Sequence, residues 1–164
     1  APLYDEPFMA AVPSTHALAQ KDHVSTSDLK NETMLLLGSG HCFRDHVLQV
    51  CPEFARYASN AEGIRRTFEG SSLETIKHMV AAGMGVTLVP RLSVPADALE
   101  TTARRRKTDE PHIRYLPILE DDGSPPPTRR VVLAWRRSFT RYEAIAALRN
   151  AVYACALPGV KRLS

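Results

Sequence analysis

The sequence predicts an α/β domain, because short apolar runs alternate along the chain with segments of helical periodicity. Four apolar runs have the length of buried strands and are bounded by turn-forming residues: 8–12, 34–37, 85–90 and 131–135. Two further strands are expected at 65–69 and 113–119. Because strands that alternate with helices usually form βαβ units, a largely parallel sheet is expected.

Two amphipathic helices are expected in the second half of the chain. One begins at Ser71-Ser72-Leu73-Glu74, which has the spacing of a capping box, and ends at Gly83. The other covers 142–156 and carries one apolar stripe: Ile145, Leu148, Val152 and Cys155. Such a stripe needs a partner surface, and if the last helix is isolated it stays partly uncovered.

Shorter features are expected in the first 30 residues. Ser25 or Thr26 is the expected cap of a helical turn at 25–29. The polar stretch 14–23 predicts a loop in which His16 is simply solvated.

Composition and length indicate one soluble domain of ordinary size. The chain has 164 residues, of which 44% are hydrophobic and 24% charged. It contains neither an apolar run long enough to cross a bilayer nor the pattern of a secretory signal. Three cysteines are too few for a disulfide scaffold, so we expect a reducing, cytoplasmic setting without a membrane partner.

The charge pattern gives no nucleic-acid module within the chain. The net charge is +3, and the only dense basic run is Arg104-Arg105-Arg106-Lys107. This run is interpreted as a solvated connector rather than a phosphate site, because it lacks aromatic residues and periodicity. Any DNA-binding part is therefore expected outside this chain. The glycines of Gly38-Ser39-Gly40 do not form a dinucleotide fingerprint, and no cofactor is expected.

Two cysteines stand at the two ends of one predicted helix. Cys42 begins the segment and Cys51 ends it, just before Pro52, and Ser39 is the expected N-cap. Nine residues at helical rise separate the two sulfurs by about 13.5 Å along the axis. A disulfide requires Cα atoms within about 7 Å, so these thiols can join only if the helix unwinds.

The start of this helix suits a reactive thiol. Free amide groups and the positive end of the helix dipole favour a thiolate at Cys42. His41 and Arg44 add positive charge or donors, and Asp45 can orient either of them. A thiolate of this kind attacks peroxide to give a sulfenic acid, which condenses with a second thiol. Cys51 is the natural resolving thiol.

The residues of this segment also fit other interpretations. Both cysteines can be small buried apolar side chains, which are common in α/β cores. A metal site from His41, Cys42, His46 and Cys51 lacks the usual ligand spacing, so no metal is expected. A serine hydrolase is not indicated, because no Gly-x-Ser-x-Gly motif is present.

At two blocks the chain resembles the regulatory domain of the OxyR group of LysR-type transcriptional regulators. The first block runs from Gly40 to Asp45 (Gly-His-Cys-Phe-Arg-Asp), with a second cysteine nine residues after Cys42. The second runs from Ser72 through Met79-Val80-Ala81-Ala82-Gly83 to Pro90, and it is similar to LysR-type effector domains in general. The first block is the one specific to peroxide sensors.

The resemblance implies a fold, a function and partners. It implies the LysR-type effector-binding domain, which resembles a periplasmic binding protein, and a redox switch in which Cys42 reacts with hydrogen peroxide and Cys51 forms the disulfide. His41, Arg44 and Asp45 would support the peroxide pocket. It also implies a homo-oligomer that is a dimer of dimers, promoter DNA bound through a separate domain, RNA polymerase, and a thiol reductant such as glutaredoxin.

The same resemblance implies a division of the chain. Residues 1–12 would be a crossing strand from subdomain I, and 13–130 would form subdomain II with the redox segment 38–54. Residues 131–156 would be the return strand and last helix of subdomain I, and 157–164 a tail.

Two other functions remain open from the sequence. One is a LysR-type domain that binds a small organic acid, with Ser71 and Ser72 as an anion site at a helix N-terminus in the cleft. Simple capping by these serines is the plainer interpretation. The other function is an enzyme, a thiol peroxidase that turns over with a thioredoxin-type reductant.

Overall fold

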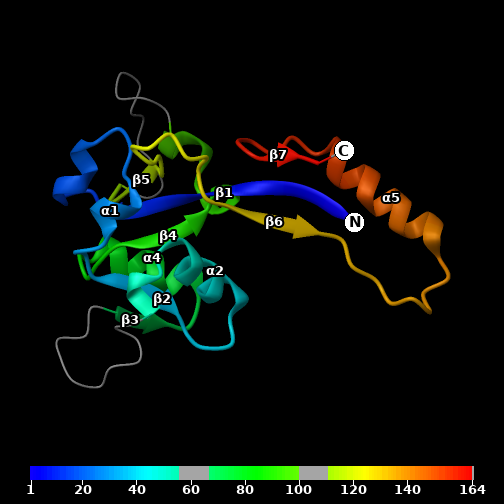
Figure 1. The fold of residues 1–164 in the computed structure, drawn as a ribbon, viewed down its shortest axis with the longest axis horizontal. Helices are drawn as coiled ribbons and strands as arrows, with labels where there is room; N and C mark the ends of the chain where they lie inside the picture. The colour runs from blue at the N-terminus through cyan, green and yellow to red at the C-terminus, as the bar shows by residue number, and fades with distance from the viewer. Residues whose placement is uncertain (56–66, 100–110, 164) are drawn as a thin grey trace.

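The molecule has a body of sheet and helices that continues into an arm, and strand β1 runs through both (Figure 1). The computed structural model describes residues 1–55, 67–99 and 111–163. Strand β1 spans Pro2–Pro13, which is longer at both ends than the predicted 8–12. The basic run at 104–107 and the first residues of the strand expected at 65–69 lie outside the described residues.

The sheet of the body is mixed rather than largely parallel. Strand β1 pairs antiparallel with β4 (Thr87–Pro90) on one side and with β5 (Ile113–Pro117) on the other. Strand β2 (Met34–Leu37) pairs parallel with β3 (Thr67–Gly70), and a parallel bridge joins Met34 to Val86. The prediction of parallel pairing therefore fails for β1. It holds for β2, β3 and the segment before β4, which the helices connect, whereas β1 enters the sheet from the arm and runs the opposite way.

Two longer helices and several short ones cover the body. Helices α2 (Cys42–Val50) and α4 (Leu73–Ala81) pack on the sheet, and α1 is one turn at Thr26–Leu29. The 3-10 turns are η1 (Ala17–Gln20), η2 (Arg91–Ser93) and η3 (Ala96–Leu99). The core between these elements includes fully buried side chains from the strands and helices alike: Leu29, Met34, Leu35, Phe54, Ile76, Leu88 and Leu116.

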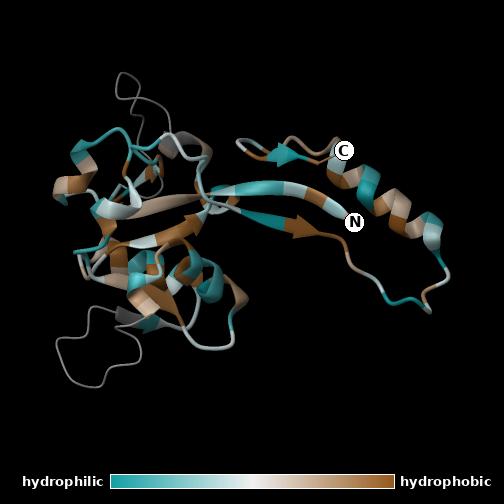
Figure 2. Ribbon diagram, viewed as in Figure 1, coloured by the Kyte–Doolittle hydropathy of each residue, from teal (hydrophilic) through white to brown (hydrophobic). Residues whose placement is uncertain are grey.

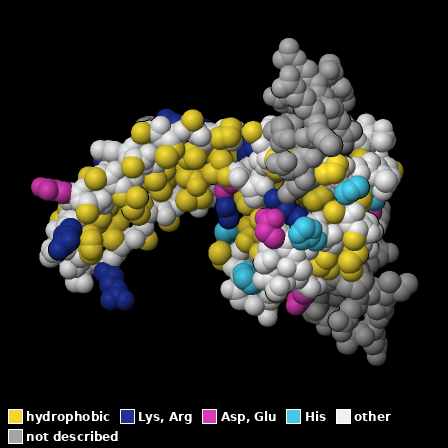
Figure 3. All heavy atoms as spheres, turned by 180° about the vertical axis from the view of Figure 1, so that it is seen from behind, with side chains coloured by type: hydrophobic (Ala, Val, Ile, Leu, Met, Phe, Trp, Pro, Cys, Tyr) yellow, Lys and Arg dark blue, Asp and Glu magenta, His cyan; other side chains and the backbone are white. Residues whose placement is uncertain are grey.

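The arm is built on the first half of β1. Strand β6 (Thr128–Val132) pairs antiparallel with it, so that Glu6 faces Arg129, and β7 (Lys161–Arg162) also pairs antiparallel with it. The last predicted strand thus ends at 132 rather than 135. Helix α5 (Tyr142–Ala154) follows and has no buried residue. Hydrophobic side chains gather on the arm, and the end of β6 is strongly apolar (Figures 2 and 3).

Cys155 does not lie in a core, although its place on the apolar stripe predicted one. It follows α5, is exposed, and its thiol donates to the carbonyl of Ala151 at 3.3 Å. The stripe itself is only partly covered, as Leu148 is 53% exposed. An apolar stripe determines which face of a helix would be buried, but a neighbouring surface must be present to bury it.

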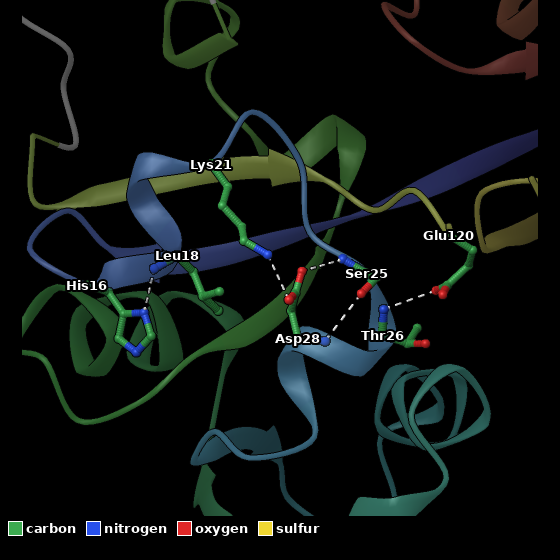
Figure 4. Close-up of polar contacts among 7 residues, drawn as sticks. All are labelled: His16, Leu18, Lys21, Ser25, Thr26, Asp28 and Glu120. Carbon is green, nitrogen blue, oxygen red and sulfur yellow. Dashed lines mark hydrogen bonds and ion pairs between the residues drawn. The ribbon is translucent and has the colours of Figure 1, made fainter. Parts of the chain in front are cut away.

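Side-chain caps hold the two short helical turns that follow β1 (Figure 4). Ser25 caps α1, because its hydroxyl accepts from the amide of Asp28 while that carboxylate accepts from the Ser25 amide. His16 is not simply solvated. Its Nδ1 accepts from the amide of Leu18 at the start of η1, and its Nε2 lies 3.0 Å from Oε2 of Glu32.

A buried ion pair joins β1 to β6 where the arm leaves the body. Glu6 is 1% exposed, and its Oε2 accepts from Nε of Arg129 at 2.8 Å. Its Oε1 accepts from the amide of Leu92 at 2.8 Å, so both carboxylate oxygens have partners. The neighbouring pair of Asp5 and Arg130 is bidentate but open to water.

We expect Arg129→Met to lower the free energy of unfolding by about 3–5 kcal/mol, because it leaves the Glu6 carboxylate buried without its cation. Glu6→Gln in the same background should restore part of the loss. Arg130→Met is the matched control on the same strand pair and should change the urea midpoint little, since exposed ion pairs stabilise weakly. Equal losses for the two arginine variants would contradict this account.

Candidate functional site

Cys42 is the first residue of helix α2, and Cys51 directly follows its last residue. The helix begins two residues later than the predicted Ser39 N-cap implies. His41 is the N-cap residue and makes no side-chain cap hydrogen bond, so Cys42 is the first helical residue. Ser39 is not the cap. Gly40 has φ +98°, a left-handed conformation that delays the start of the helix, and few other residues adopt it.

Arg44 fastens the first turn of α2 to the ends of two strands. One guanidinium nitrogen donates to the carbonyl of Leu37, the last residue of β2, at 2.8 Å. The same nitrogen lies 2.7 Å from Oε1 of Glu69 in β3, and only 12% of the Arg44 side chain is exposed. Arg44 therefore holds the position of Cys42 relative to the sheet, rather than pointing freely into solvent.

The inner face of α2 rests on aromatic and apolar residues. Phe43 and Val47 are buried. The ring of Phe43 lies 5.7 Å from that of Phe8 in β1, and the guanidinium carbon of Arg129 lies 5.4 Å from the Phe43 ring centre. Phe43, the residue that follows Cys42, thus contacts the ion pair at the base of the arm.

Cys42 and Cys51 differ sharply in environment, and both are free thiols. Cys42 is exposed at the first turn. Cys51 is 1% exposed at the C-cap of α2, where its amide donates to the carbonyl of Val47 at 2.9 Å. Since nine helical residues extend from Cys42 to Val50, the intact helix separates the two ends by roughly 13.5 Å.

Burial controls the protonation of Cys51. Loss of solvent around the sulfur raises the pKa of this thiol to about 12, and the carboxylates of Glu53 and Glu120 raise it further. At neutral pH Cys51 is therefore a protonated thiol and a poor nucleophile as long as α2 and its surroundings stay folded.

The other predicted residues of the segment lie at its surface. His41 and Asp45 are exposed, and Asp45 is the acidic residue of the first turn. An acidic side chain there is stabilised by the helix dipole. His46 lies half-buried, and its Nδ1 is buried without a hydrogen-bond partner. Among the residues that the structure describes, no three His, Cys, Asp or Glu side chains gather as a metal-binding group.

Ser71 and Ser72 lie at the start of α4, which follows β3 as α2 follows β2. Because Leu37 and Gly70 are register partners in parallel strands, both helices begin at the same edge of the sheet. Ser72 is the N-cap, and its hydroxyl accepts from the amide of Thr75 at 3.1 Å. The Ser71 hydroxyl lies 3.5 Å from that of Thr75. Ser72 therefore caps the helix, one residue after the Ser71 start of the predicted capping box. An anion site here stays a prediction.

Sequence reasoning missed the residues that anchor α2 from a distance. Phe8, Glu69 and Arg129 come from three different strands, and only the fold brings them to the helix. No local pattern marks any of them.

Within the described part of the chain, no helix has the length and apolar character needed to cross a bilayer.

Alkylation should distinguish the three cysteines. With iodoacetamide on the folded protein at pH 8, we expect Cys42 and Cys155 to be labelled well before Cys51, because Cys51 is buried and its raised pKa keeps its thiol protonated. In urea the three rates should become similar. Peptide mass spectrometry measures each rate, and rapid native labelling of Cys51 would refute its burial.

The raised pKa of Cys51 makes the stability of the fold depend on alkaline pH. Unfolded cysteine titrates near 8.5, so above that pH the unfolded state loses a proton that the folded state keeps up to about 12. The contribution of the protonated Cys51 thiol to the free energy of unfolding is complete below about pH 8.5 and disappears as pH rises toward 12. Between pH 8 and 11, the free energy of unfolding of the wild type should fall by up to about 1.4 kcal/mol per pH unit relative to that of Cys51→Ala. Urea unfolding measures both. Cys155→Ala is the control and should follow the wild type.

Comparison with known proteins shows the family. The model of the LysR substrate binding domain matches residues 1–154. The hydrogen peroxide-inducible genes activator of Pectobacterium carotovorum is 37% identical over 148 residues, which cover 88% of this chain and 42% of that protein. The chain thus spans less than half the length of this relative.

Solved structures agree with the sequence comparison. A reduced form of OxyR from N. meningitidis is 38% identical, with a TM-score of 0.78, over 100% of this chain and 68% of that one. An oxidised form of OxyR is 33% identical, with a TM-score of 0.65, over 94% of this chain and 63% of that one. Since the family model covers nearly the whole sequence, the chain belongs to the LysR substrate-binding domain family.

Proposed function

We propose that this domain is the hydrogen-peroxide sensor of a LysR-type transcription regulator, in which Cys42 and Cys51 form a reversible disulfide. The observation that carries the proposal is the placement of two free thiols at opposite ends of α2, one exposed and one buried. The relatives are peroxide-inducible activators, and solved OxyR structures include reduced and oxidised forms.

The chemistry proceeds in two balanced steps. The Cys42 thiolate attacks one oxygen of hydrogen peroxide, the O–O bond breaks, and the departing hydroxide takes a proton to become water. Cys42 is then a sulfenic acid. The Cys51 thiolate attacks that sulfur, the S–O bond breaks, and a second water leaves. Two thiols are oxidised to one disulfide while one peroxide is reduced to two waters.

The helix acts as the barrier between these two steps. The second step requires α2 to unwind, because its ends are too far apart to join, and unwinding also exposes Cys51 so that it can ionise. Unwinding costs the burial of Phe43 and Val47, roughly 1.5–3 kcal/mol for each side chain. Oxidation of Cys42 without that change gives a sulfenic acid but no disulfide.

A change in α2 has a direct route to the arm. Phe43 contacts Arg129, which pairs with Glu6, and these two residues lie on the strands that connect body and arm. Removing Phe43 from its place takes away the aromatic face under that guanidinium. This route supports a signal that leaves the body through β1 and β6.

The wider setting belongs to the same proposal. Residues 1–12 and 131–156 would belong to subdomain I and 13–130 to subdomain II. The arm supports this division for the first half of β1 and for 131–156, whereas the second half of β1 pairs with β4 and β5 in the body. The domain would act in the cytoplasm within a dimer of dimers, with promoter DNA bound through a part outside this chain. RNA polymerase would be contacted by the activator, and a glutaredoxin-type reductant would reset the disulfide. The relatives are transcription regulators, which argues against a thiol peroxidase.

Stoichiometric peroxide should crosslink Cys42 to Cys51, as mapped by mass spectrometry of unreduced peptides. Cys42→Ser should abolish the crosslink, and Cys51→Ser should leave a sulfenic acid that oxidises further. Cys155→Ser is the matched control and should crosslink like the wild type. A folded protein that never joins Cys42 to Cys51 would rule out the mechanism.

The same samples test whether α2 unwinds. Amide hydrogen exchange should accelerate across α2 after oxidation while α4, also a nine-residue helix, stays protected. A crosslinked protein with α2 still protected would contradict the proposed switch.

A further inference from the structure

A cavity outside the redox helix lies along β1 and β5, at the outer edge of the sheet, and its wall residue Phe8 also contacts Phe43 of α2. It has a volume of about 630 Å³ and is lined by the middle of β1, by β5 and by the C-terminal segment that includes Gly159. Helix α2 follows β2, which lies beyond β4 on the other side of β1. The walls are largely apolar and include Phe8, Met9, Leu116, Ile118 and Leu119. A cavity of this size is typical of small-molecule sites.

Two guanidinium groups share this apolar cavity. Arg91 comes from η2 and Arg114 from β5, and both line it. The Nε–H of Arg114 is buried without a hydrogen-bond partner. A buried donor without an acceptor destabilises a fold by about 1–3 kcal/mol, which a bound acceptor can relieve. Asp22 also lines the cavity but is exposed, so the described lining carries two positive charges and one negative.

The C-terminal segment closes one side of the cavity. Gly159 has φ +76°, and a Cβ at this position would lie 2.9 Å from Nε of Arg91. The backbone therefore approaches the Arg91 side chain as closely as only glycine permits. In Figure 1 the same segment turns back from α5 toward the body. An occupant would touch the body and the C-terminal segment at once.

We propose that this cavity binds a small carboxylic acid with an apolar body. Its hydrocarbon part lies against β1 and β5, and its carboxylate accepts hydrogen bonds from Arg114 and Arg91. Guanidinium is the side-chain group that matches a carboxylate with two parallel donors, and a site shielded by apolar walls strengthens that pairing. The occupied cavity holds the C-terminal segment against the body. This binding is independent of the cysteine chemistry and of the helix N-termini at Ser71 and Ser72.

Octanoate is the probe, and octan-1-ol and octylammonium are its neutral and cationic counterparts. Isothermal titration of the reduced chain should give saturable, one-to-one binding of octanoate and much weaker binding of the other two. Methyl NMR should show contacts from the octanoate chain to Met9, Leu116 and Ile118. Cys42→Ser should bind octanoate like the wild type, which separates this proposal from the redox proposal.

Arginine variants test the charge requirement. Arg114→Met and Arg91→Met should each weaken octanoate binding by about 10-fold or more, since a charged hydrogen bond contributes at least that factor. Arg137→Met removes an exposed arginine of the arm outside the cavity and should change nothing. If Arg114→Met does not fold, Arg91→Met and the comparison with octan-1-ol decide. Equal binding of octanoate and octan-1-ol, loss of binding in Arg137→Met, or no saturable binding would overturn the proposal.

Discussion

The length of one helix governs the chemistry of this domain. An intact α2 holds Cys42 and Cys51 at opposite ends, and a disulfide has no geometry that spans such a distance. The bond and the helix therefore exclude each other. In the proposed switch, a covalent change at one sulfur would become a conformational change because the two thiols lie at the ends of one helix rather than on adjoining loops. The same separation keeps the reduced state free of an accidental crosslink.

Burial adds a second restraint of a different kind. Cys51 is enclosed by the core and by nearby carboxylates, which keeps its proton in place in the folded state. Cys42 is exposed, whereas Cys51, its proposed disulfide partner, is buried. Burial and the raised pKa thus both make Cys51 a poor nucleophile in the folded state. Arg44, Phe43 and Val47 determine how firmly the closed form is held.

The base of the arm is where the redox segment and the rest of the molecule meet. The ring of Phe43 lies against the guanidinium of Arg129, which pairs with Glu6. The Glu6 carboxylate also accepts a hydrogen bond from the amide of Leu92 in η2. Three parts of the chain therefore depend on one buried carboxylate. The cavity with Arg91 and Arg114 lies across β1 from α2, close to the same junction. A ligand there and a disulfide in α2 would both act on strand β1.

The sequence by itself determined the α/β class, a helix between Gly40 and Pro52 with the two cysteines near its ends, the Ser25 cap and the cysteine spacing. These are local properties, fixed by periodicity, breakers and capping chemistry within a few residues. Only the tertiary structure decided the antiparallel pairing of β1, the exposure of Cys155, the His41 N-cap in place of Ser39, and the anchoring of α2 by Glu69 and Arg129. Those features depend on which distant segments become neighbours, and no pattern within one segment specifies its neighbour.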